Sequence, residues 1–149
     1  MSTDTLDRDV RRHVFQHFLE AALPPTANQT AAALGISLAE ARAAYEHLAA
    51  DHVFVLEPGT LDIRMANPLS AIPTDFPVTV EGKRFYGACA WDALGVVAML
   101  GGTGIIRTNC GCCGEPMTLK LVDSKLRSPV GVVHFAVPVA HWWDDIVYT

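Results

Sequence analysis

The sequence predicts an α+β protein made of two modules. In the first half, apolar residues recur at helical spacing in three runs, and two short alternating runs follow on either side of a turn. In the second half, alternating runs typical of β-strands surround a single helical run that begins near residue 89. We therefore expect a helical N-terminal module, and a C-terminal module in which one main helix packs on a small mixed or antiparallel sheet.

The N-terminal helices are expected over about residues 7–22, 27–34 and 38–51. Thr26 is a suitable N-cap for the second helix, and Ser37 with Glu40 forms an S-x-x-E capping box for the third. A turn signal at 57–60 then separates two alternating runs and predicts a β-hairpin. Because three helices and a hairpin follow one another in this order, residues 1–66 are interpreted as a winged-helix (helix-turn-helix-like) module.

Residues 67–76 are rich in turn formers and small side chains, and we interpret them as an extended linker that packs against the second half. The C-terminal module then occupies residues 77–149. Its predicted elements are a hairpin over 78–86, a helix from about 89 to 100, and strands over 105–108, 117–122 and 130–137.

The distribution of charge argues against a nucleic-acid partner. The formal net charge is -5, and residues 1–75 hold five Lys/Arg against ten Asp/Glu. The segment that would enter a DNA groove, residues 37–52, carries Arg42 against three carboxylates, whereas binding to phosphates needs basic side chains. We therefore expect the winged-helix module to serve as a scaffold.

The apolar stretches predict a cytoplasmic protein without a membrane segment. The first residues are polar and charged, and no apolar run follows a basic cluster as it does in a secretory signal. The longest apolar stretch, 91–106, is interrupted by Asp92 and by glycines, and it is shorter than the roughly 20 residues needed to cross a bilayer. In this compartment the four cysteines are expected to be reduced.

Cys89 and Asp92 are the candidate catalytic pair. They are three residues apart at the start of the predicted helix, so their side chains lean to one side and can share a ligand. The helix N-terminus is expected to favour the Cys89 thiolate, whose charge would keep a proton on Asp92. A sulfur that binds a soft metal beside an acid that delivers a proton is what protonolysis of a carbon–metal bond requires. The alternative is a buried structural cysteine with a capping aspartate.

Cys110, Cys112 and Cys113 form a second cluster in a C-x-C-C-G run. A C-x-x-C-G step is typical of half a zinc site, but the chain contains no second C-x-x-C that would complete four ligands. The trio can instead bind Hg²⁺, Cu⁺ or Zn²⁺, with Cys89 or the later histidines as outside ligands. It can also be a cysteine-containing turn with Cys110 buried, and both alternatives stay open.

The run R-F-Y-G-A-C-A-W-D-A-L over residues 84–94 resembles the active-site segment of the organomercurial (alkylmercury) lyase family. Cys89 and Asp92 match the positions of that family's first catalytic cysteine and its catalytic aspartate. Cys110, ahead of Gly-Glu-Pro and an apolar strand, resembles a cysteine that is structural in the family. The family also begins with a winged-helix-like domain, joined by a segment that residues 68–73 resemble.

The resemblance implies an enzyme of mercury resistance that cleaves R–Hg⁺ to RH and Hg²⁺ without an organic cofactor. An organomercurial or Hg²⁺ would be its small-molecule partner. The candidate metal ligands are Cys89, Asp92, Cys110, Cys112 and Cys113. Zinc or copper is a further candidate for the cysteine cluster.

The second catalytic cysteine of the family has no counterpart where we expect it. In the family that cysteine follows a strand like 130–137, whereas residues 141–149 here contain none. Three explanations are open: a natural short form, a fragment of a longer protein, or a reading frame ended at a UGA codon that encodes selenocysteine. Alternatively, Cys112 or Cys113 supplies the second thiol.

A non-catalytic function is the alternative. In it the chain is a soft-metal-binding or metal-responsive regulatory protein, whose winged helix binds DNA or a partner and whose cysteines sense the metal. The acidic N-terminal half favours the enzyme, because that half is poorly suited to DNA. The missing cysteine favours the sensor.

Overall fold

The computed structural model describes residues 3–127 and 131–147 of the chain. The first elements are the helices α1 (Thr3–Ala21), α2 (Ala27–Leu34) and α3 (Leu38–Ala50). They are followed by the strands β1 (Phe54–Leu56), β2 (Ile63–Ala66) and β3 (Leu69–Ser70), which form a small antiparallel sheet in that order.

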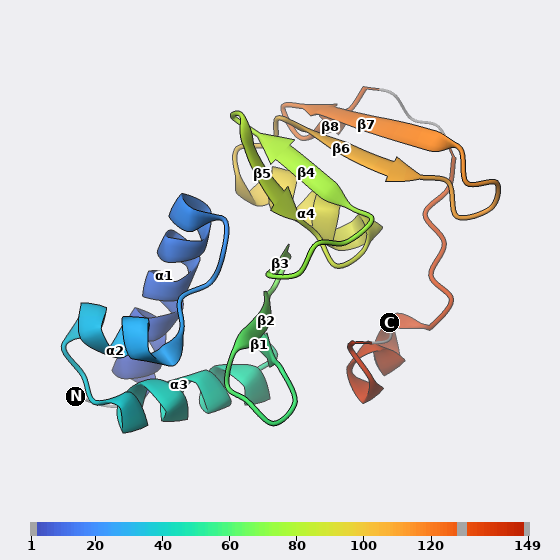
Figure 1. The fold of residues 1–149 in the computed structure, drawn as a ribbon. Helices are drawn as coiled ribbons and strands as arrows, with labels where there is room; N and C mark the ends of the chain where they lie inside the picture. The colour runs from blue at the N-terminus through green and yellow to red at the C-terminus, as the bar shows by residue number, and fades with distance from the viewer. Residues whose placement is uncertain (1–2, 128–130, 148–149) are drawn as a thin grey trace.

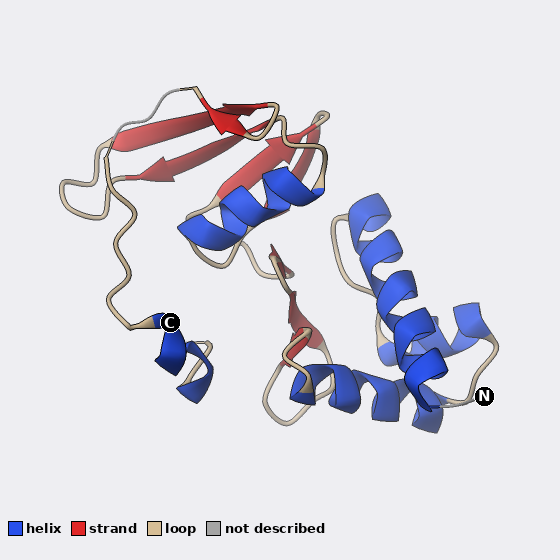
Figure 2. Ribbon diagram, turned by 180° about the vertical axis from the view of Figure 1, so that it is seen from behind, coloured by secondary structure: helices blue, strands red, loops and turns tan. Residues whose placement is uncertain are grey.

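The second half of the chain forms a larger antiparallel sheet with strand order β5-β4-β6-β7-β8. Its strands are β4 (Pro77–Val80), β5 (Lys83–Tyr86), β6 (Gly104–Asn109), β7 (Pro116–Val122) and β8 (Lys125–Leu126). Helix α4 (Ala90–Met99) connects β5 to β6 and lies on one face of this sheet, and a short 3₁₀ helix, η1 (Val139–Asp144), comes near the C-terminus (Figures 1 and 2). The predicted α+β class, with one main helix on a mostly antiparallel sheet, is confirmed.

The helix caps of the first half form where the sequence predicts them. The Thr26 hydroxyl accepts the backbone N–H of Gln29, and α2 ends at Gly35, which has a left-handed φ of 64°. Ser37 and Glu40 form a complete capping box at the start of α3. Because each cap satisfies backbone groups left unpaired at a helix end, these local signals fix both helix boundaries.

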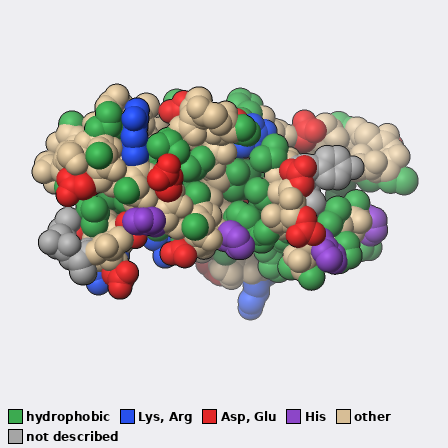
Figure 3. All heavy atoms as spheres, turned by 90° about the horizontal axis from the view of Figure 1, so that it is seen from below, with side chains coloured by type: hydrophobic (Ala, Val, Ile, Leu, Met, Phe, Trp, Pro, Cys, Tyr) green, Lys and Arg blue, Asp and Glu red, His purple; other side chains and the backbone are tan. Residues whose placement is uncertain are grey.

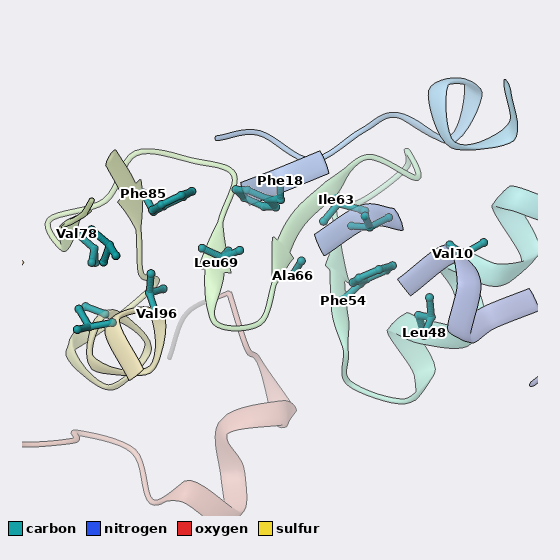
Figure 4. Packing of buried hydrophobic residues seen from close by; sticks show 14 of the residues in the cluster. Val10, Phe18, Leu48, Phe54, Ile63, Ala66, Leu69, Val78, Phe85 and Val96 are labelled. Carbon is teal, nitrogen blue, oxygen red and sulfur yellow. The ribbon is translucent and has the colours of Figure 1, made fainter. Parts of the chain in front are cut away.

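One hydrophobic core continues from the helical half into the larger sheet. Figure 4 shows Phe54 and Ile63 among the helices, and Val78 and Phe85 on the side of the larger sheet. Leu69 on β3 lies between these groups and is fully buried. The segment interpreted as a linker therefore contains a buried strand, which also forms a bridge from Leu69 to Gly87.

Helix α4 packs on its sheet through one apolar stripe. Ala93, Val96 and Val97, at three- and four-residue spacing, are fully buried and face the side of the helix that contacts β4 and β6. This packing fixes the position of the residues at the N-terminal end of α4. Within residues 3–127 and 131–147, no helix has the length and apolar character needed to cross a membrane.

The predicted strand over 130–137 is wrong for the residues that are described. Residues 131–137 form no strand, and β8 takes the edge of the sheet instead. Val132 is 93% exposed and Val133 is 45% exposed, so this apolar run is not paired with the sheet. Residue 130 lies outside the described residues. The run is apolar enough for a strand, but a strand also needs a free sheet edge to pair with. The local sequence does not show whether such an edge is available.

Tyr45 connects α3 to α2 through buried hydrogen bonds. Its hydroxyl donates to the carbonyl of Pro25 at 3.0 Å and lies 2.7 Å from the Thr30 hydroxyl. Burial raises the pKa of Tyr45 from 10.0 to about 12. In the folded protein the phenol therefore holds its proton more tightly than in the unfolded chain.

We expect Tyr45→Phe to lower the free energy of unfolding by about 1 to 3 kcal/mol near neutral pH, because the carbonyl of Pro25 and the hydroxyl of Thr30 lose a buried partner. The raised pKa contributes stability that is complete below about pH 10 and is lost as pH rises through about 12. Urea unfolding over this range should show the difference between wild type and variant shrinking. A difference that stays constant with pH, or Tyr86→Phe behaving in the same way, would contradict the assignment.

Candidate functional site

Cys89 stands at the junction between the larger sheet and α4. It is the N-cap residue of α4, in extended conformation, and its side chain is half-buried. Asp92 lies in the first helical turn, and the Cys89 thiol donates a hydrogen bond to Asp92 Oδ2 with an S–O distance of 3.6 Å. The structure thus brings the two predicted catalytic residues into direct contact.

The Cys89 thiol is less acidic than the sequence suggested. Burial raises the pKa of Cys89, and the nearby Asp92 charge adds to the rise. The backbone N–H groups of Asp92 and Trp91 lower the pKa but do not reverse the shift. The expectation that the helix N-terminus favours a thiolate is therefore wrong for the free protein, because loss of hydration has the larger effect.

The Asp92 carboxyl follows the expected direction, for a different reason. Burial is the largest cause that raises the pKa of Asp92, while the Cys89 thiol and the backbone N–H groups of Cys89 and Ala88 lower it. The proton is therefore favoured on Asp92 by loss of water and not, as predicted, mainly by a negative sulfur. Burial thus raises the pKa of both groups of the pair.

The pair opens into a cavity of about 430 Å³ between α4, the β2–β3 segment and the C-terminal segment. Polar side chains on the β2–β3 side include Arg64, Asn67 and Ser70. Cys89 and Asp92 contribute the reactive groups.

Aromatic side chains form the outer wall of this cavity. The Trp91 ring meets the Phe135 ring edge to face at 6.5 Å, and Phe135 lies 5.0 Å from Trp142. Trp142 Nε1 donates to the carbonyl of Val137. Trp143 also lines the cavity.

The C-terminal segment is attached to the helical half by a stacked pair of rings. Trp143 stacks on His52 with ring centroids 3.8 Å apart and planes 7° from parallel. Neither this contact nor the place of Phe135 in the site could be predicted from the sequence, because each depends on how distant segments meet. Apolar residues about fifty positions away along the chain therefore line the cavity that contains Cys89.

The other predicted metal ligands lie elsewhere. Cys110, Cys112 and Cys113 occupy the turn between β6 and β7, and none of them lines the Cys89 cavity. Backbone N–H groups of Cys113 and Cys112 lower the pKa of Cys110. Cys110 is half-buried rather than buried as the cysteine-turn alternative supposed.

The histidines proposed as outside ligands are not gathered at these cysteines. His134 is exposed, and His141 Nδ1 lies 2.9 Å from the Asp144 carboxylate. In the part of the chain that the structure describes, no group of three or more His, Cys, Asp and Glu side chains is placed to hold a metal ion.

Comparison with known proteins identifies a family and a similar fold. A family model described as alkylmercury lyase (MerB) matches residues 69–149, which include Cys89, Asp92 and the cysteine turn. A solved structure, the crystal structure of the mercury-bound form of MerB2, has a similar fold with a TM-score of 0.66 at 23% sequence identity. That similarity covers 82% of this chain, which spans 58% of the length of the MerB2 chain. No curated protein matches the sequence.

Proposed function

This chain belongs to the alkylmercury lyase family, and on that premise we propose that it cleaves the carbon–mercury bond of organomercurials by protonolysis. Cys89 is the sulfur ligand of mercury, and Asp92 is the proton donor. The observation that carries the proposal is the hydrogen bond from the Cys89 thiol to Asp92 within a cavity that is lined in part by aromatic rings. It supplies a soft ligand and a proton at the same point.

The first step is exchange of a ligand on mercury. An organomercurial R–Hg–X, in which X is a small thiolate, enters the cavity, and Cys89 Sγ forms a bond to mercury as the Hg–X bond breaks. X leaves as the free thiolate and binds mercury again as its second ligand after the carbon–mercury bond has been cleaved. The thiol proton moves along the existing hydrogen bond to the Asp92 carboxylate. A thiol with a raised pKa therefore need not ionise in advance, because its proton is transferred as mercury binds.

The second step is cleavage of the carbon–mercury bond. The electron pair of that bond takes the proton from Asp92, so RH leaves, Asp92 returns to a carboxylate, and Hg²⁺ stays on Cys89 Sγ. No electrons are gained or lost by the protein. Burial raises the pKa of Asp92, so it favours the protonated Asp92 that the first step forms and that donates the proton here.

The aromatic wall fits the organic part of the substrate. Trp91, Phe135 and Trp142 present apolar rings to the cavity that holds the pair, which suits an alkyl or aryl group on mercury. Among the described residues, Cys89 is the one cysteine that lines this cavity. A small thiol is therefore the second mercury ligand in the reaction that we propose.

The test is a single-turnover reaction of methylmercury or phenylmercury with excess protein and a free monothiol, in which methane or benzene is measured. We expect close to one hydrocarbon per organomercurial. Mercury that binds tightly without any hydrocarbon release would show a thiol metal-binder in place of a lyase. Protein unfolded in urea, with the same thiols, is the control for uncatalysed cleavage.

We further propose that residues 1–66 form a winged-helix scaffold that does not bind nucleic acid. The exposed charges of α3 are Arg42 against Glu40 and Glu46, while Tyr45 and Leu48 are buried. Figure 3 shows acidic and histidine side chains spread over the face that is lowest in Figure 1, with few Lys and Arg. In a gel-shift titration at low salt we expect no retardation of duplex DNA, and salt-sensitive retardation would contradict this prediction.

A further inference from the structure

The turn between β6 and β7 carries Cys110 and Cys113 on one short, closed loop. The N–H of Cys110 donates to the carbonyl of Glu115, and the N–H of Gly114 donates to the carbonyl of Cys110, each at 2.8 Å. Cys110 and Cys113 are three residues apart within this closed turn, which keeps their backbones close together. Gly114 has the left-handed φ of 75° that lets the chain reverse.

These sulfurs are open to solution. Cys113 is exposed, Cys110 is half-exposed, and both are free thiols. Figure 1 shows their turn extending from the end of the β6–β7 ribbon. Because Cys110 and Cys113 belong to one short turn, a metal ion bound by one of these sulfurs encounters the other at a high effective concentration.

The number of ligands favours a two-coordinate soft ion. Zinc in structural sites takes four ligands, and the described residues offer no group of three or more at any one place. Hg²⁺ is satisfied by two thiolate sulfurs in a near-linear arrangement. Thiolates also select soft ions over the harder divalent ions.

The turn lies at the end of a surface that leads from the Cys89 cavity. Asn109 and Pro116, the residues on either side of the turn, line a shallow recess of about 340 Å³. Thr74 lines both this recess and the Cys89 cavity, so the two hollows adjoin each other.

We propose that Cys110 and Cys113 form a second mercury site, a dithiolate that binds one Hg²⁺ and receives the ion released at Cys89. Binding replaces two S–H bonds with two S–Hg bonds and releases two protons to solvent, and on transfer one proton returns to the Cys89 sulfur. Neither sulfur nor mercury changes oxidation state. The binding of Hg²⁺ at the turn stands by itself, whereas the receiving role rests on the proposed function.

Retention of inorganic Hg²⁺ tests the site without any cleavage. We load Cys89→Ser protein with Hg²⁺ in the presence of excess monothiol, desalt it, and measure mercury per chain. We expect about one mercury per chain, because a chelating pair competes with monothiols better than a single sulfur does. Adding Cys110→Ser and Cys113→Ser to this variant should remove that mercury, whereas adding Cys112→Ser, the matched control in the same turn, should not.

Two results would overturn the site: release of all mercury from Cys89→Ser protein, or equal loss from the Cys112→Ser control.

The receiving role is tested by successive turnovers without added thiol. The ratio of second-turnover to first-turnover hydrocarbon should fall at least several-fold in the Cys110→Ser/Cys113→Ser protein and recover when monothiol is added. An unchanged ratio would overturn the receiving role. If wild type releases no hydrocarbon, the proposed function and the receiving role both fail, while the retention experiment still decides the site.

Discussion

Cys89→Ser and Asp92→Asn are each expected to reduce single-turnover hydrocarbon release by at least about a hundredfold. Serine cannot replace sulfur as a ligand of soft mercury, so the first variant fails at binding. Asparagine keeps the size and the hydrogen-bond acceptor of Asp92 but has no acidic proton, and removal of a general acid typically costs 10² to 10⁴ in rate. Because Cys89 Sγ and Asp92 Oδ2 are 3.6 Å apart, we expect the two losses of activity to reflect one shared mechanism.

The two variants should differ in mercury binding, which separates the roles. With methylmercury and a competing monothiol, Asp92→Asn is expected to retain organomercurial on Cys89, whereas Cys89→Ser is expected to lose it. Bound mercury and released methane are measured on the same sample. The double variant should be no slower than the slower single variant, because residues that act in one step are not additive.

Matched substitutions outside the cavity control for general effects. Cys112→Ser changes an exposed thiol, and Asp123→Asn changes an exposed carboxylate in the β7–β8 turn, where the left-handed φ of 52° suits asparagine. Neither should alter single-turnover release. Full activity in Cys89→Ser or in Asp92→Asn would refute the role assigned to that residue.

The sequence predicted those parts of the fold that depend on neighbouring residues. The capping box of Ser37 and Glu40, the cap at Thr26 and the turn at Gly35 each act within four residues, and the structure has α2 and α3 where these signals place them. The C-x-x-D spacing of Cys89 and Asp92 is local in the same sense, because one helical turn fixes their distance.

The parts that could not be predicted depend on contacts between distant segments. The linker over 67–76 was expected to pack against the second half, but not to contain a strand that pairs with β2, nor to bury Leu69 in a core shared by both halves of the chain. The wall residue Phe135 and the stack of Trp143 on His52 have no signal in their own neighbourhoods. For the same reason the sequence could not weigh the burial of Cys89 against the helix N-terminus, and the direction of its pKa shift came out wrong.

Gly87→Ala is expected to lower the free energy of unfolding by about 2 to 3 kcal/mol or more, because the site has no room for a methyl group. A Cβ at Gly87 would collide with the backbone nitrogen of Ala93, and it would lie 2.7 Å from the Ala93 Cα and 2.9 Å from the carbonyl carbon of Asp92. These are backbone atoms of the first turns of α4, so no side chain can turn aside to relieve the collision.

The backbone of Gly87 cannot move away from α4 easily either, because hydrogen bonds hold it on both sides. Gly87 donates its N–H to the carbonyl of Phe76 at 3.1 Å, and its carbonyl accepts from the Thr74 hydroxyl at 2.5 Å. The methyl group must therefore push α4 away from the strand, and with it the turn that carries Asp92. A shift of about 1 Å in a reacting group can cost about a hundredfold in rate, so cleavage should fall even where the protein stays folded.

Urea unfolding and single-turnover release, measured on the same preparation, test both effects. Gly111→Ala is the matched control, because the same methyl group added there meets no atom within 4 Å. We expect the control to keep its stability and its cleavage rate. If Gly87→Ala unfolded within about 0.5 kcal/mol of wild type and cleaved at the same rate, the close contact between residue 87 and α4 would not hold the catalytic pair in place. A folded but slow variant would instead show that this contact positions Cys89 and Asp92 for proton transfer.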